Sequence, residues 1–201
     1  MKIKIMILFA VSMLFMSCVG IDTVIDLNQD GSGSVTFEYR ISDIVMNLGQ
    51  NDGRSIPLPV SKADFEDTVR KTAGLSLRSY KITESGNDSL ITAKIDFDNE
   101  DALLLLLNCG MTDCVSLTRK DGVTVFRQTL SHGNVPDINP EILLNMKSMF
   151  DGYSIKTTLN LPVKPSGASG GEIIGRTCIS DDYGTGDVLF SEKPVVWEVQ
   201  W

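Results

Sequence analysis

The sequence IDTVIDLNQDGSGSVTFEYRI, residues 21–41, places a polar, glycine-rich cluster between two segments in which every second residue is apolar or β-branched. A period of two residues is the period of a β-strand that buries one face. The dipeptide Asp30-Gly31 suits the positive φ angles of a tight turn. The stretch therefore predicts a β-hairpin whose turn is the polar cluster DLNQDGSGS, residues 26–34.

The same polar cluster has the first half of an EF-hand calcium loop. Asp26, Asn28 and Asp30 offer side-chain oxygens at positions 1, 3 and 5, and a glycine follows at position 6. An EF-hand also needs a carboxylate at position 12, where Phe37 stands, and a helix on each side. We therefore favour a turn without a metal, and a secreted calcium-dependent adhesin is an alternative hypothesis.

Beyond this hairpin, helix-like and strand-like segments alternate along the chain. Ser61 is a capping residue before one helical pattern, and Gly74 is a stop signal after it. An Asn-Pro-Glu sequence at residues 139–141 begins another helix, and Asp121-Gly122 marks a second tight turn. The predicted helices cover residues 62–73, 102–107 and 139–151. The further predicted strands cover residues 75–83, 89–97, 115–119, 123–130 and 153–161, and more strands are expected after residue 171, ending in one at 194–201.

The sequence also predicts which side chains of these elements are buried and where two irregular segments lie. Five consecutive leucines, residues 103–107, indicate a helix that is buried from most sides. In the last strand, alternation places Trp197, Val199 and Trp201 on one face. Residues 165–171 are predicted to form a mobile loop, and residues 170–175 a turn. The inward face of the third helix is predicted to consist of Ile142, Leu143, Met146, Met149 and Phe150.

Together these elements predict an α+β fold. Its antiparallel β-sheet is built from successive hairpins, with about three helices packed on one side. The 184 residues that follow position 17 are enough for one domain with a real core. We expect a single domain over residues 21–201.

The amino terminus has the pattern of a signal peptide. Lys2 and Lys4 precede twelve apolar or small residues, Ile5 to Met16, and Ser17 and Cys18 follow. A membrane-spanning helix needs roughly 20 apolar residues, so this segment is too short to span comfortably. We expect residues 1–17 to be removed.

The end of this segment, LFMSC at residues 14–18, resembles the lipobox of bacterial lipoproteins. The resemblance implies diacylglycerol attachment to the thiol of Cys18 and cleavage before it. Because the alternating pattern starts at Ile21, we expect only a very short stem at residues 18–20. The resemblance also implies a protein anchored in the cell membrane or outer membrane, facing the periplasm or the cell exterior. The alternatives are cleavage after Gly20, which would release a secreted protein, and an uncleaved signal anchor.

Charge and cysteine content restrict the partners and the redox chemistry. Without Lys2 and Lys4 the chain has 16 basic and 26 acidic residues, a formal balance of −10, which disfavours binding to nucleic acid. If Cys18 carries lipid, Cys109, Cys114 and Cys178 remain, and they allow one disulfide in three ways. Cys109 and Cys114 are close in sequence and form one candidate pair. Three buried thiols are the alternative.

No catalytic, cofactor or metal site is predicted from the residues. The one histidine, His132, has no G-x-S-x-G motif or other nucleophile context. Zinc needs several His or Cys ligands, and the chain offers one histidine and four cysteines, of which Cys18 would carry lipid. The spacing of Cys109 and Cys114 is wider than in a zinc knuckle. The runner-up hypothesis is an envelope hydrolase that uses His132 or one of the acidic pairs. These pairs are Asp96 with Asp98, Glu100 with Asp101, and Asp181 with Asp182.

Three longer motifs resemble the LppM-type domain of bacterial lipoproteins. They are DTVIDLNQDGSGSVTFEY at residues 22–39, FDGYSIKTTLNLP at residues 150–162 and PVVWEVQW at residues 194–201. The resemblance spans nearly all of residues 20–201 and implies an envelope lipoprotein with an α+β ectodomain, without catalytic residues to transfer. We expect a membrane-anchored, non-catalytic binding or scaffold domain with a protein, lipid or glycolipid ligand.

Overall fold

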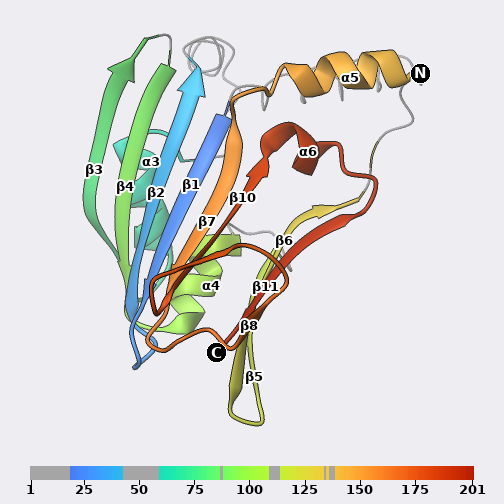
Figure 1. The fold of residues 1–201 in the computed structure, drawn as a ribbon. Helices are drawn as coiled ribbons and strands as arrows, with labels where there is room; N and C mark the ends of the chain where they lie inside the picture. Colours follow the sequence, from blue (N-terminus) through green and yellow to red (C-terminus); the bar gives the residue numbers. More distant parts are fainter. Residues whose placement is uncertain (1–18, 43–58, 87, 109–113, 134, 136–138) are drawn as a thin grey trace, which may run out of the picture.

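The computed structural model describes residues 19–42, 59–86, 88–108, 114–133, 135 and 139–201. Its strands form two sheets (Figure 1). The larger sheet has seven strands in the order β3-β4-β2-β1-β7-β10-β9, and the smaller has four in the order β5-β6-β11-β8. The seven are β1 (Val19–Leu27), β2 (Gly33–Ser42), β3 (Leu75–Ser85), β4 (Asp88–Phe97), β7 (Ser154–Asn160), β9 (Glu172–Ile174) and β10 (Cys178–Gly184). The four are β5 (Val115–Lys120), β6 (Val123–His132), β8 (Gly167–Ala168) and β11 (Pro194–Gln200).

The α+β class is confirmed, but the prediction of one antiparallel sheet is too simple. Strands β1 and β7 pair in parallel, with Ile21 opposite Ile155 and Asp26 opposite Asn160. The other strand pairs are antiparallel. Parallel pairing follows because the chain returns to the end of the sheet where β1 begins before it enters β7. In addition, the hairpins β5–β6 and β3–β4 lie in different sheets.

The opening hairpin forms as its alternation predicts. Strands β1 and β2 pair from Val19 with Ile41 to Leu27 with Gly33, and residues 28–32 make the turn. Gly31 has φ +85°, a conformation that other residues rarely adopt. The alternate residues of both strands that face the helices form the centre of the core, among them Ile25, Val35 and Ile41.

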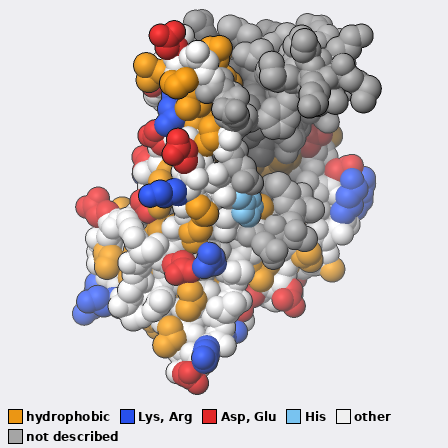
Figure 2. All heavy atoms as spheres, turned by 90° about the vertical axis from the view of Figure 1, so that its right-hand side faces the viewer, with side chains coloured by type: hydrophobic (Ala, Val, Ile, Leu, Met, Phe, Trp, Pro, Cys, Tyr) orange, Lys and Arg blue, Asp and Glu red, His pale blue; other side chains and the backbone are white. Residues whose placement is uncertain are grey.

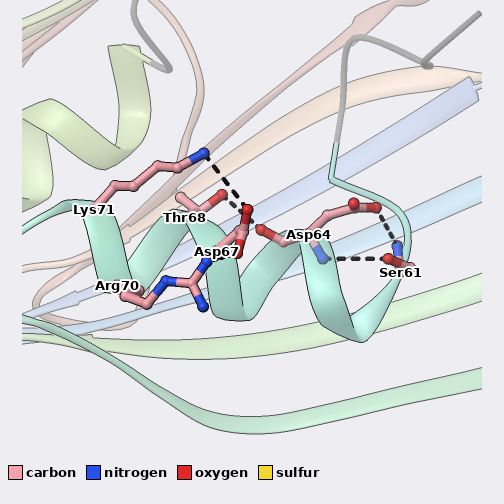
Figure 3. Close-up of polar contacts among 6 residues, drawn as sticks. All are labelled: Ser61, Asp64, Asp67, Thr68, Arg70 and Lys71. Atoms are coloured by element: carbon pink, nitrogen blue, oxygen red, sulfur yellow. Dashed lines mark hydrogen bonds and ion pairs between the residues drawn. The ribbon is translucent and has the colours of Figure 1, made fainter.

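The first predicted helix is present as α3 (Lys62–Lys71) and has a complete capping box (Figure 3). Ser61 Oγ accepts a hydrogen bond from the Asp64 backbone N–H at 3.2 Å, and Asp64 Oδ2 accepts one from the Ser61 N–H at 2.9 Å. At the other end Asp67 pairs with Arg70 and Lys71. The cap satisfies backbone donors that a helix start leaves free, and Phe65 anchors the helix in the core.

The leucine run forms α4 (Glu100–Asn108), capped by the Asn99 side chain. The prediction of burial from most sides is wrong for one residue. Leu103 and Leu106 lie in the core, whereas the side chain of Leu105 is 62% exposed. Helices α3 and α4 pack against one face of the larger sheet (Figure 1), so this short helix has one side left for solvent.

The third predicted helix is α5 (Pro140–Ser148), capped by Asn139. Its predicted inward face is wrong in part. Phe150, just after the helix, is buried, but Ile142 and Met149 are exposed, and no residue of α5 itself is fully buried. The helix lies at one end of the molecule beside α6 (Thr185–Leu189), a short helix that was not predicted (Figure 1). Because α5 lies at an end of the molecule, few other elements pack against it, and some of its apolar side chains stay exposed.

The carboxyl-terminal segment has more strand than predicted. Trp197 and Val199 are buried and Trp201 packs against the same core, as the alternation predicts. The loop predicted as mobile contains β8, which pairs with β11, and the Trp197 indole N–H donates to the Gly170 carbonyl at 3.1 Å. The predicted turn at residues 170–175 contains the edge strand β9. Both strands are too short for a periodicity signal.

Candidate functional site

The predicted lipidation residue, Cys18, lies outside the described residues, which begin at the next position in the chain. Strand β1 begins at Val19 and lies between β2 and β7 in the larger sheet. A Cβ atom added at Gly20 would lie 3.5 Å from the Ser154 carbonyl oxygen and 3.7 Å from the Tyr153 ring, so the backbone of β1 is in close contact with the start of β7 here. A lipid on residue 18 would therefore be attached almost directly to the central strand of the sheet.

A charged cluster lies near this end of the sheet. The Arg40 guanidinium pairs with Asp88 at 2.5 Å, and its carbon lies 5.3 Å from the centre of the Tyr153 ring. The Tyr153 hydroxyl donates to the other Asp88 oxygen at 3.4 Å. Asp88 is buried, so these contacts compensate its charge. The cluster joins β2, β4 and the start of β7, and this arrangement gives it a structural role.

The polar turn at residues 26–34 is held by hydrogen bonds between its own residues and neighbouring strands. Asp30 Oδ1 accepts bonds from the Ser32 N–H at 3.0 Å and the Ser32 hydroxyl at 2.6 Å. Asp26 accepts from the Ser34 hydroxyl at 2.9 Å and the Asn160 amide at 2.7 Å. Strands flank the turn on both sides, where an EF-hand has helices.

The cysteines divide between the described and undescribed parts of the chain. Cys109, and with it the candidate disulfide to Cys114, lies outside the described residues. Cys114 and Cys178 are both half-buried, and neither is bonded to another cysteine of the described residues. Burial, reinforced by the negative charge of Asp26, raises the pKa of Cys178. A raised thiol pKa lowers the thiolate fraction, so Cys178 is a poor nucleophile near neutral pH.

The three acidic pairs do not form converging carboxylates. Asp96 is bound by Arg78 at 2.8 Å, and Glu100 is paired with Arg119. Asp181 and Asp182 are consecutive in a strand, so their side chains lie on opposite faces of it. Asp181 Oδ2 accepts from the Tyr183 hydroxyl at 2.6 Å, and desolvation together with this bond raises the pKa of Tyr183. Within the described residues no three His, Cys, Asp or Glu side chains gather as a metal site would require.

His132 lies in a hollow on the outer face of the smaller sheet. The hollow has a volume of about 340 Å³ and is open to solvent. Figure 2 views the molecule from this side and shows the imidazole, in pale blue, at the surface. Strands β5, β6 and β11 supply its lining residues, which are Ser116, Arg127, Thr129, His132, Pro194 and Val196.

An irregularity in strand pairing brings His132 to this face. Thr129 pairs with Val196 and Ser131 with Val195, so Leu130 has no partner on β11. Such a bulge shifts the alternation of the strand by one residue. His132 consequently faces the same side as Thr129 although the two are three positions apart in sequence. The buried Trp197 and Phe126 lie on the other side of the same strands.

Each polar side chain that lines the hollow can donate a hydrogen bond, and the guanidinium of Arg127 can only donate. Ser116 pairs with Arg127 across β5 and β6, and Arg127 lies opposite Glu198 on β11. One guanidinium nitrogen of Arg127 donates to Glu198 at 2.7 Å. The His132 ring and the hydroxyls of Ser116 and Thr129 make no hydrogen bond to any residue of the described chain. No described carboxylate orients the imidazole, so the arrangement lacks the third member of a catalytic triad.

Sequence reasoning singled out His132 but missed the residues around it. Ser116, Arg127 and Thr129 are ordinary residues of alternating strands and stand in no motif. Their assembly depends on the pairing of β6 with both β5 and β11, which joins segments 71 residues apart at the Arg127–Glu198 contact. The bulge at Leu130 has no signal in the sequence either.

Comparisons with known proteins place the fold. No family model matches the chain, and no curated protein matches it. Among solved structures, the chain is similar to the folded domain of the Mycobacterium tuberculosis protein LppM, determined by NMR, with a TM-score of 0.55 and 12% sequence identity. The match covers 91% of this chain and 88% of that one. This likeness shows an LppM-like fold. Separately, no helix in the described part of the chain has the length and apolar character to cross a membrane.

Proposed function

We propose that the chain is a lipid-anchored, non-catalytic binding module of the bacterial cell envelope. The observation that carries this proposal is the LppM-like fold over 91% of the chain, which agrees with the LppM-type motifs and the lipobox-like residues before Cys18. A diacyl thioether with an N-acyl chain would supply more than the two lipid signals that stable anchoring needs.

The start of the sheet supports close attachment to a bilayer. Strand β1 begins one residue after Cys18, and an extended residue adds at most about 3.5 Å. A lipid at residue 18 would hold the larger sheet against the membrane without a flexible spacer. The acidic balance of the chain gives no electrostatic attraction to anionic headgroups, so the lipid itself would have to provide the affinity.

Binding is favoured over catalysis by the surroundings of His132. General-base catalysis needs a group that orients the imidazole and a nucleophile within hydrogen-bond reach. In the described residues the imidazole has no such partner, and the acidic pairs are engaged with arginines or lie on opposite faces of a strand. The surface that these residues offer is a recognition surface, for a protein or a lipid.

One observation keeps a hydrolase as the second candidate. His132 shares its hollow with the hydroxyls of Ser116 and Thr129, and either is a conceivable nucleophile. Treatment of the purified full-length protein with a fluorophosphonate tests this candidate. Covalent labelling that is lost in Ser116→Ala or in Thr129→Ala would establish it, and unlabelled protein would remove it.

The intact mass of the native protein tests the proposed anchor. Full-length protein is expressed in a bacterial host, extracted from membranes and analysed by mass spectrometry, beside the variants Cys18→Ser and Cys178→Ser. We expect the mass of residues 18–201 plus two or three acyl chains, unchanged by Cys178→Ser apart from the substitution. We expect Cys18→Ser to lose the acyl chains. A mature chain that begins at Ile21, or a wild-type protein released from membranes by salt alone, contradicts the proposal.

A further inference from the structure

We infer that the hollow around Arg127 and His132 binds a small ligand that carries a carboxylate or phosphate group. This assignment rests on the proposed function of a binding module and adds the chemical class of the ligand. The residues that line the hollow carry it, and it can be tested without reference to the lipid anchor.

The donors of the hollow converge on one space without being used by the fold. Arg127 has five N–H donors and uses one for Glu198 within the described chain. The hydroxyls of Ser116 and Thr129 and the imidazole of His132 line the same space. Donors without protein partners require acceptors from solvent or a ligand. An oxyanion provides several acceptor oxygens at once, and charge strengthens each bond.

Glu198 does not take the place of such a ligand. It lies opposite Arg127 on the neighbouring strand and contacts one nitrogen of the guanidinium. Its side chain is not one of those that line the hollow. The contact with Glu198 uses one N–H of the guanidinium and leaves the other N–H donors of Arg127 without a partner in the described chain. A guanidinium that already has one contact loses less conformational entropy when it binds an anion.

The remaining walls favour a ligand with an apolar part next to its charge. Pro194 and Val196 form one side of the hollow, opposite the polar residues of β6. A volume of about 340 Å³ is at the lower end of the range for small-molecule sites. It fits a compact organic acid or a phosphorylated headgroup fragment. The overall charge of the chain is −8, which makes a donor-rich hollow a local exception on an acidic protein.

The single histidine makes a direct test feasible. His132 is the only histidine of the chain, so the two histidine C–H signals in an NMR spectrum of the full-length protein in detergent micelles both come from its imidazole. Sodium phosphate and sodium acetate are titrated in separate arms at fixed pH and constant ionic strength, with sodium chloride as the third arm. We expect a saturable shift with phosphate or acetate and none with chloride. The stronger of the two oxyanion arms identifies the preferred group.

Three variants separate a site from a general salt effect. Arg127→Gln removes the guanidinium, and we expect the half-saturating concentration to rise about tenfold. Arg119→Gln removes a comparable arginine on β5 that pairs with Glu100 outside the hollow, and we expect no change. Glu198→Gln keeps an acceptor for Arg127 but removes the negative charge beside it, and we expect equal or tighter binding.

The outcomes that overturn the inference are equally specific. A linear shift that chloride reproduces, or binding that Arg127→Gln leaves unchanged, would show that no such site exists. Equal losses in Arg119→Gln and Arg127→Gln would show a response to overall charge. If Arg127→Gln does not fold, the Nε–H signal of Arg127 in the unmodified protein is followed instead, and its failure to move with the His132 signal overturns the inference. Failure here leaves the anchor untouched, because the acyl mass is measured separately.

Discussion

Asn160 on β7 donates its side-chain amide to Asp26 on β1 at 2.7 Å, although 134 residues separate the two in sequence. The two residues are partners in the parallel register of these strands. Asp26 also accepts from the Ser34 hydroxyl and lies 3.6 Å from the Lys94 ammonium. One carboxylate thus links four strands of the larger sheet on its outer face.

This contact predicts a stability that depends on pH. Burial alone raises the pKa of Asp26, but the hydrogen bonds from Asn160 and Ser34 and the charge of Lys94 outweigh it, so the folded-state pKa lies below 3.8. The carboxylate therefore stabilises the fold above about pH 4, and this contribution disappears as the pH falls through the folded-state pKa. We expect Asp26→Asn to lower the free energy of unfolding by about 1 kcal/mol at pH 7, a modest loss because the side chain is 43% exposed.

Urea unfolding at pH 7 and at pH 3 measures this effect. The difference between wild type and Asp26→Asn should be largest at pH 7 and should shrink at pH 3. A difference that stays constant over this range would contradict the assigned pKa shift.

The leucine run of α4 provides a matched pair of substitutions. Leu103 is 1% exposed and Leu105 is 62% exposed. We expect Leu103→Ala to cost about 2–5 kcal/mol through the cavity it leaves, and Leu105→Ala to cost less than about 0.5 kcal/mol. Denaturant unfolding of both variants checks the orientation of the helix. Similar losses in the two variants would show that α4 is packed on both sides.

Gly33 should not accept a side chain. A Cβ at this position would lie 1.9 Å from the Asp26 carbonyl oxygen and 2.6 Å from the Phe97 ring. We expect Gly33→Ala to lower stability by about 2 kcal/mol or more, because β1 or Phe97 must move. Gly167→Ala is the control, since its nearest neighbour is 3.8 Å away at the end of the Gln200 side chain. Thermal unfolding should leave this control close to wild type.

The capping box of α3 predicts a smaller and chemically specific loss. Ser61→Ala removes the acceptor for the Asp64 N–H, and we expect a cost of about 1 kcal/mol. Ser61→Asp retains an acceptor and should restore most of the stability. Circular dichroism during urea unfolding compares the three proteins. If alanine and aspartate behave alike, the cap contributes little.

Local chemistry predicts much of this fold. The hairpin at residues 21–41 follows from alternation around a turn, and α3 and α4 follow from capping residues and apolar spacing. These signals are carried by residues within about ten positions of one another, so a single sequence contains them. The LppM-like fold inferred from the motifs agrees with the structural likeness to LppM.

Long-range pairing could not be predicted in the same way. The parallel alignment of β1 with β7, the division into two sheets and the short strands β8 and β9 depend on partners far away in sequence. Periodicity indicates which face of a helix is apolar, but not whether other residues cover that face. For this reason the prediction that Ile142 faces the core is wrong. The hollow around His132 depends on both kinds of information, a long-range pairing and a bulge.

The position of β1 has a consequence for the order in which the strands can pair. The first strand of the described chain is flanked on one side by β2, its immediate successor, and on the other by β7, which lies more than a hundred residues later in the sequence. Until β7 has paired, one edge of β1 offers unpaired backbone groups to any other extended chain. The incompletely folded polypeptide would therefore benefit from a chaperone until β7 closes that edge.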